Sequence, residues 1–151
     1  MKAIKTLMII AATLCCGMNA FAQANGDAIL GEYYLKDAKN GDSKVLFTKN
    51  SSGTYDCEIT WIEIPDDPKT GKPWLDVRNP DKSLRGRQVL GIKIIEGIPY
   101  DEESGTWTGA KIYDPNRGIK ANATIKLCDD GRLEVSGKVL GIGETQYWDR
   151  L

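Results

Sequence analysis

The 151-residue chain contains no histidine. This absence excludes Ser-His-Asp and Cys-His catalysis as usually built, and it removes the commonest zinc ligand. Acids, lysines, tyrosines and thiols remain for proton chemistry, but they form no recognisable catalytic constellation. A hydrolase that works without histidine is therefore the least favoured function, and we expect neither a metal ion nor a cofactor.

The chain also lacks an excess of positive charge and a long hydrophobic run. Its formal net charge is −1, which gives no indication of nucleic-acid binding, because that function needs a basic face. Its one apolar run, residues 7–16, is too short to span a bilayer, which takes roughly 20 apolar residues. We therefore expect no transmembrane segment in the mature chain.

The N-terminus has the three parts of a secretory signal peptide. Lys2 and Lys5 precede the apolar run, and the small-x-small triplet of residues 20–22 follows it. An N-terminal core helix is the alternative, but such a helix should show a polar face. We expect residues 1–22 to be cleaved, residues 23–151 to form a single domain, and the product to be exported, either periplasmic or secreted.

Only two cysteines, Cys57 and Cys128, remain after this processing. An oxidising compartment permits a disulfide between them, which would contribute about 4 kcal/mol in the chain-entropy model. The alternative is two unpaired thiols on different strands, and the sequence leaves both open.

What the mature chain does contain is a series of short β-type runs separated by turn signals. Asn116-Arg117-Gly118 and Asp129-Asp130-Gly131 tolerate the positive φ of tight hairpins. Residues 119–127 alternate strictly between apolar and polar side chains, as in an antiparallel sheet with one buried face. Eight strands are predicted, at residues 33–35, 44–48, 54–64, 90–98, 106–113, 118–128, 132–140 and 145–151.

About eight antiparallel strands joined by short turns favour an all-β, up-and-down barrel, because closure hides the edge strands. A barrel of this size leaves room for side chains or for one small ligand. A β-sandwich is the alternative architecture.

One connection, residues 65–89, is much longer than the others and carries four prolines. Asn79 followed by Pro80 is typical of a helix start, so residues 81–85 are predicted to form one helical turn. Long loops in compact domains are usually functional or disordered. Because this one holds Trp74, Leu75 and Leu84, we expect it to pack down.

Several segments together resemble the bacterial family of unknown function numbered 2147. They are Trp61 to Pro65, Asp76 to Arg87 with its Asn-Pro-Asp, Trp107 to Pro115 with its Tyr-Asp-Pro, and Thr145 to Arg150. The resemblance covers nearly the whole mature chain. It implies a secreted or periplasmic protein with a lipocalin-like (calycin) barrel, and no known reaction.

The resemblance also implies a contact between the two ends of the chain. Lipocalins typically open with Gly-x-Trp and carry an Arg on the last strand that packs over that Trp. Here Tyr33 stands in the Trp position. Arg150 could still stack on Tyr33, since guanidinium groups lie well on aromatic faces.

The tryptophans have two interpretations, an aromatic-walled ligand cavity or ordinary core packing. Trp61, with Cys57 and Ile59, is predicted to lie on one face of its strand, and core packing is favoured for Trp61 and Trp148. Trp74, on the long loop, could act as a lid at a barrel mouth. Trp107 belongs to the same candidate wall.

Arg78, Arg85 and Arg87 on the long loop could clamp an anionic head group. Local ion pairs with Asp76, Asp81 or nearby carbonyls are the favoured alternative. Asp114 could be a general base, although Asp before Pro more often shapes a turn. The candidate ligand-binding residues are Tyr33, Trp61, Trp74, Arg78, Arg85, Trp107, Tyr113, Trp148 and Arg150.

The sequence favours a protein that binds a small, largely apolar or amphipathic ligand in its barrel. The alternative is an envelope protein-interaction module whose barrel is filled by its own side chains. Oligomeric state and ligand identity are not predicted.

Overall fold

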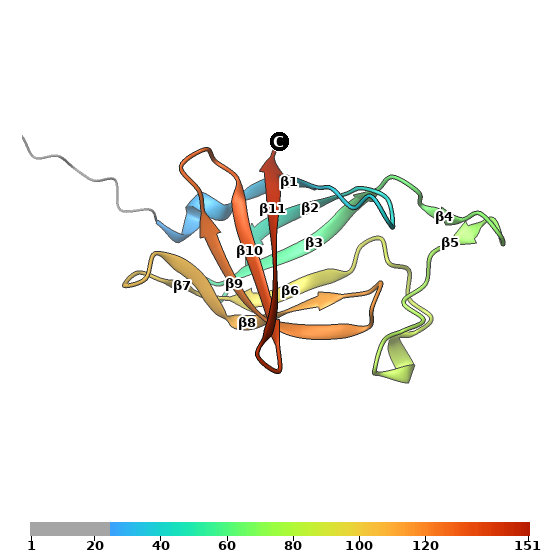
Figure 1. Ribbon diagram of the computed structural model, residues 1–151. Helices are drawn as coiled ribbons and strands as arrows, with labels where there is room; N and C mark the ends of the chain where they lie inside the picture. The colour runs from blue at the N-terminus through green and yellow to red at the C-terminus, as the bar shows by residue number, and fades with distance from the viewer. Residues whose placement is uncertain (1–24) are drawn as a thin grey trace, which may run out of the picture.

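The structure is a computed structural model that describes residues 25–151, so the predicted signal peptide lies outside it. Eight strands form the barrel shown in Figure 1. Their bounds are β1 Gly31–Leu35, β2 Ser43–Lys49, β3 Tyr55–Ile62, β6 Lys93–Ile98, β8 Thr106–Asp114, β9 Ile119–Leu127, β10 Leu133–Val139 and β11 Ile142–Arg150. A two-residue strand, β7 (Tyr100–Asp101), extends the hairpin that leads into β8.

The strands pair antiparallel in chain order, and two pairings close the sheet on itself. β1 pairs with β11, which joins the first and last strands, and Ile95 of β6 pairs with Ile112 of β8. The predicted all-β, up-and-down barrel of eight strands is thereby confirmed, and the sandwich alternative was wrong. No helix among residues 25–151 is long and apolar enough to cross a bilayer.

The two ends of the barrel differ. A 3-10 helix that the sequence did not predict, η1 (Gly26–Ile29), precedes β1 and packs Ile29 into the core. The aromatic side chains that fill this end are at most 2% exposed: Tyr33, Phe47, Trp107 and Trp148. This end is called the closed end below. The open end lies where β1, β3, β8 and β10 finish.

Trp61 does not lie on the core face of β3, contrary to the prediction. Lys44 pairs with Trp61 but Val45 pairs with Ile59, so Thr60 is an extra residue in a β-bulge. A bulge shifts the alternation of side chains by one residue. Trp61 therefore turns to the outer face, 39% exposed, where it stacks on Tyr34.

The long connection between β3 and β6 is ordered by short elements. β4 (Asp66–Asp67) pairs with β5 (Lys72–Pro73), and η2 (Lys82–Leu84) is a single 3-10 turn. The predicted helical turn is present, but Asp81 rather than Asn79 caps it, by accepting from the Ser83 backbone N–H. Asn79 is instead buried beneath the loop.

The last hairpin turns at Leu140-Gly141, so β11 begins at Ile142, three residues before the predicted start at Thr145. Leu140 has a φ of 49° and Gly141 one of 83°. Positive φ at both central residues is the type I′ geometry, which favours Asn-Gly. A leucine in this conformation is strained, and Leu140 is also 98% exposed.

Candidate functional site

The closed end is held by the contact that the resemblance implied. The Arg150 guanidinium lies 5.5 Å from the centre of the Tyr33 ring. Its Nη1 donates to the Tyr33 hydroxyl and to the Ala28 carbonyl, and its Nη2 donates to the Leu30 carbonyl. The Tyr33 hydroxyl in turn donates to Ile29. This network ties the last strand to η1 and β1.

The remaining aromatic candidates at this end are core residues. Trp107 is fully buried and donates from Nε1 to the Gly26 carbonyl, and Trp148 packs against Phe47. Side chains with no exposed surface cannot line a solvent-accessible cavity. The closed half of the barrel is therefore filled by its own side chains.

The two thiols are unpaired in the structure. Cys57 lies in the core on β3, and burial raises the pKa of its thiol. Cys128 is partly exposed just after β9. The structure thus corresponds to the second of the two alternatives, unpaired thiols.

A buried carboxylate anchors the long loop to the barrel. Asp76 is fully buried, and its Oδ1 accepts a hydrogen bond from the Tyr113 hydroxyl. Its Oδ2 accepts from Asn79 Nδ2 at 2.7 Å and from Arg87 Nε at 3.0 Å. Burial, followed by the hydrogen bond to Asp76, raises the pKa of the Tyr113 hydroxyl. Both carboxylate oxygens are thus satisfied within the protein.

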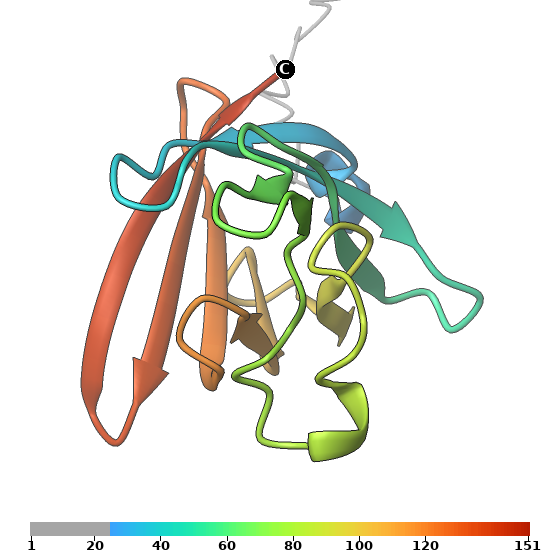
Figure 2. The same ribbon diagram turned by 90° about the vertical axis from the view of Figure 1, so that its right-hand side faces the viewer.

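This cluster lies on the outer side of the barrel. Ile112 pairs with Ala121, and both face inward with Gly137, so the next residue, Tyr113, faces outward. Arg87 lies over the outward ring, 5.9 Å from its centre. The loop is therefore fastened at the rim, and Figure 2 shows it passing in front of the open end.

The other loop arginines make local contacts or none. Arg85 donates to the Asn79 carbonyl. Arg78 is exposed, and its carbonyl lies so close to Gly118 that a Cβ there would clash. The Arg85 contact is the local kind that the sequence favoured over an anion clamp.

Asp114 accepts from the backbone N–H groups of Asn116 and Arg117 and so shapes the β8–β9 turn. This is the interpretation that the sequence favoured over a general base.

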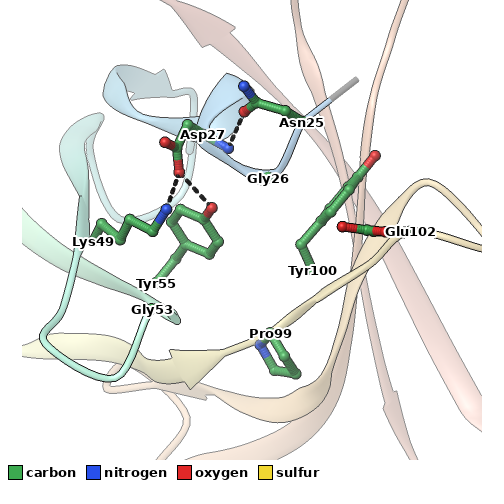
Figure 3. A pocket seen from close by; sticks show the side chains of 9 residues that line it. All are labelled: Asn25, Gly26, Asp27, Lys49, Gly53, Tyr55, Pro99, Tyr100 and Glu102. Carbon is green, nitrogen blue, oxygen red and sulfur yellow. Dashed lines mark hydrogen bonds and ion pairs between the residues drawn. The ribbon is translucent and has the colours of Figure 1, made fainter. Parts of the chain in front are cut away.

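A hollow of about 440 Å³ lies outside the closed end, between η1 and the β7–β8 hairpin. Figure 3 shows its walls, from which Asp27, Lys49 and Tyr55 point toward one another. Asp27 Oδ1 accepts from Lys49 Nζ at 2.7 Å and from the Tyr55 hydroxyl at 2.6 Å. These contacts lower the pKa of the Asp27 carboxyl. Because Asp27, Lys49 and Tyr55 satisfy one another, these three polar groups offer little to a ligand.

The open end has the opposite character, because inward-facing apolar side chains are exposed there. Along β10, residues 133, 135, 137 and 139 share the inner face, and Leu133 is fully buried whereas Val139 is 36% exposed. Along β11, the inner face runs from Trp148, 2% exposed, to Ile142, 80% exposed. Ala121 and Gly137 lie side by side on the inner face at this end, and neither carries a large side chain.

A charged clamp lies beside this inner face. Arg117 Nη1 and Nη2 donate to the two oxygens of Glu144, at 2.9 and 2.8 Å, and Arg117 Nε donates to Asp114. These hydrogen bonds raise the pKa of the guanidinium still further. Glu144 belongs to the inner face of β11, so the clamp joins the β8–β9 turn to that face. It places polar groups next to exposed aliphatic ones.

The structure does not gather the nine predicted site residues in one place. Tyr33, Trp107, Trp148 and Arg150 belong to the closed end, Trp61 to the outer face, and Trp74, Arg78, Arg85 and Tyr113 to the long loop and its anchor. Among residues 25–151, no cluster of three or more acids and cysteines is arranged to hold a metal ion. Sequence reasoning missed Asp76 and Asn79 as a buried pair, although the Asn-Pro-Asp segment indicated a structured loop.

Comparison with known proteins agrees with this fold. The model of a family described as "Uncharacterized protein conserved in bacteria (DUF2147)" matches residues 31–150. A solved structure is similar, with a TM-score of 0.65, 22% sequence identity and 82% of each chain covered. It is described as protein HP1028 from the human pathogen Helicobacter pylori, belonging to the lipocalin family. No curated protein matches the chain.

Proposed function

Because the chain belongs to the bacterial family DUF2147 and folds as a lipocalin-like barrel, we propose that it binds a small, largely apolar ligand at the open end of that barrel. The observation that carries the proposal is the exposure of inward-facing aliphatic side chains at that end. Val139 and Ile142 continue the inner face of the barrel beyond its open end, where they are 36% and 80% exposed. A bound apolar ligand would cover this surface.

The packed half of the barrel limits how deep a ligand can reach. Val45, Cys57, Ile98 and Ile125 have no exposed surface, so the ligand does not extend to the closed end. It lies against Ile112, Ala121 and the inner face of the β10–β11 hairpin. The Arg117–Glu144 pair beside that face suits a ligand with a polar end, which makes an amphipathic molecule the best fit.

Titration with a polarity-sensitive apolar dye tests the proposal. Ala121→Trp places a large ring on the inner face of β9, whereas Asn122→Trp places the same ring on the outer face of the same strand. We expect Ala121→Trp to weaken dye binding at least about tenfold, because the ring occupies the ligand's position. Asn122→Trp should bind as the parent does, and equal binding by all three proteins would refute the proposal.

The second candidate is an interaction module that acts through its surface, favoured by the packed closed half of the barrel. It predicts that neither Ala121→Trp nor Asn122→Trp changes the dye titration.

On either function we propose that residues 1–22 direct the chain out of the cytoplasm, to the periplasm or beyond. N-terminal sequencing of the purified protein checks this, since cleavage is expected after Ala22.

A further inference from the structure

Two exposed apolar tips project from the same end of the molecule. One is the β10–β11 turn, where Leu140 is 98% exposed and Ile142 is 80% exposed. The other is η2, which carries Leu84, 37% exposed. Figures 1 and 2 are related by a rotation about the vertical, and both tips are the lowest points of the described chain in each. They point in one direction, so one flat surface could meet both.

Twelve large hydrophobic side chains are exposed between residues 25 and 151, and the two most exposed of them, Leu140 and Ile142, lie at the β10–β11 tip. Val139 of the same hairpin and Leu84 of η2 are two more of the twelve. Exposed apolar side chains gathered at one end of a molecule mark an interaction site. The strained φ of Leu140 supports the same conclusion, because Asn at this turn position would relieve the strain and would not expose a leucine.

The charges around the tips are positive. Lys82 begins η2, Lys138 precedes the hairpin turn, and Arg78 lies on the same loop as η2; all three are exposed. None of the three forms an ion pair within residues 25–151.

The acids at this end, in contrast, are held by partners. Asp76 pairs with Arg87, and Asp114 and Glu144 pair with Arg117. Asp81 accepts from Ser83 but forms no ion pair in the described part of the chain, so its negative charge stands beside Lys82. Lys82, Lys138 and Arg78 outnumber this one unpaired acid, so the net charge of these groups is positive.

We propose that the open end docks on an anionic lipid surface, with Leu140 and Leu84 entering the interface and Lys82, Lys138 and Arg78 facing the head groups. Aliphatic side chains flanked by lysine and arginine are the combination that binds such a surface, by burial of apolar area together with attraction to anionic lipid. The docked orientation brings the exposed inner face of the barrel to the membrane. This docking does not require a bound ligand, so it can fail while ligand binding survives, and the reverse.

Co-sedimentation with vesicles tests the proposal. The probes are vesicles of phosphatidylcholine alone and of phosphatidylcholine mixed equally with phosphatidylglycerol. We expect binding to the mixed vesicles, far weaker binding to the neutral ones, and loss of binding as salt rises, because salt screens the lysines. Failure to bind mixed vesicles overturns the proposal.

The decisive variant is Leu140→Asn, which leaves the inner face of the hairpin unchanged. The change relieves the strained φ, so the variant should fold at least as stably as the parent, which thermal unfolding checks. We expect its vesicle binding to fall at least about tenfold. The matched control is Leu151→Ser, which removes an equally apolar, 61% exposed side chain at the far end of the barrel and should bind as the parent does. Equal loss in both variants contradicts the proposal.

Two charge-reversal variants and a fluorescent reporter complete the test. Lys82→Glu should weaken binding several-fold, whereas Lys126→Glu, on the outer face of β9, should not. Leu140→Trp places a fluorophore at the tip, and its difference emission from the parent should shift to the blue on mixed vesicles. The N-terminus is the same in every protein compared, so it cannot produce these differences. An unshifted emission from the tip during vesicle binding overturns the proposal.

Discussion

Arg150 lies over the ring of Tyr33 and donates to its hydroxyl, so the second-to-last residue of the chain closes the barrel against its first strand. The same guanidinium covers Gly31, which has a φ of 133° and leaves room for it. Tyrosine therefore serves where lipocalins typically carry tryptophan. The Tyr33 hydroxyl accepts a hydrogen bond from Arg150, whereas an indole has only a donor N–H and could not accept one.

Arg150→Lys should destabilise the protein by about 2 kcal/mol. Lysine keeps the charge but cannot reach the Tyr33 hydroxyl, Ala28 and Leu30 together, because it lacks the planar fork of donors. Tyr33→Phe should cost about 1 kcal/mol, since it removes only the hydroxyl. Urea unfolding measures both, and two variants as stable as the parent would show that the contact contributes nothing to closure.

The tryptophans should separate into two classes. Trp107→Ala removes a fully buried side chain and should cost about 3–5 kcal/mol. Trp61→Ala removes a ring stacked on Tyr34 at the surface and should cost about 1 kcal/mol. Urea midpoints give the comparison. Equal costs would contradict the bulge at Thr60 that turns Trp61 outward.

Asp76 should control the opening of the long loop without controlling the barrel. Asp76→Asn weakens the contacts from Asn79 and Arg87, which lowers the free energy of local opening by about 2 kcal/mol, a factor of about 30. Trypsin should then cleave near Arg78 and Lys82 faster by roughly that factor. The control is Asp81→Asn, an exposed carboxamide on the same loop that keeps an acceptor for Ser83. Equal cleavage of the two variants would remove Asp76 from this role.

Stability should fall in acid partly through Asp56. Burial tends to raise the pKa of this carboxyl, but hydrogen bonds from Lys93, the Gly97 backbone and Asn50 outweigh it and hold the pKa below the ordinary 3.8. A carboxyl with a lowered folded pKa stabilises the fold fully above its unfolded pKa, and that contribution is lost as the pH falls through the folded value.

Asp56→Asn should therefore cost about 1–3 kcal/mol at neutral pH. Its stability should also depend less on pH below about pH 5 than that of the parent. Urea unfolding between neutral pH and about pH 3 measures this. Parallel pH profiles for parent and variant would exclude Asp56 as a source of the acid sensitivity.

The barrel could be predicted because its signals are local. Alternation in residues 119–127 and the turn glycines at 118 and 131 specify strands and hairpins directly. The outward turn of Trp61 could not be predicted, because a bulge depends on the register between two strands and leaves no mark in the alternation of one. The same holds for Asp76, whose burial depends on Tyr113, 37 residues away.

The candidate site was predictable only as a region. The sequence indicated that the long loop was structured, yet Arg85 and Arg87 contact other loop residues and the Tyr113 ring. The exposed inner face of the last hairpin was not predicted, since a break was expected at residues 141–143, where β11 in fact begins. Exposure of an inward-facing side chain such as Ile142 depends on how far its hairpin extends beyond the neighbouring strands.

The central claim, a small apolar ligand at the open end, is tested most directly by native mass spectrometry of the protein purified from its own cells, with solvent extraction of what it carries. The account predicts a defined added mass on the parent and on Asn122→Trp, extractable as an amphipathic molecule, and its absence from Ala121→Trp. A clean unliganded mass for the parent under gentle conditions, or the same added mass on Ala121→Trp, would contradict it.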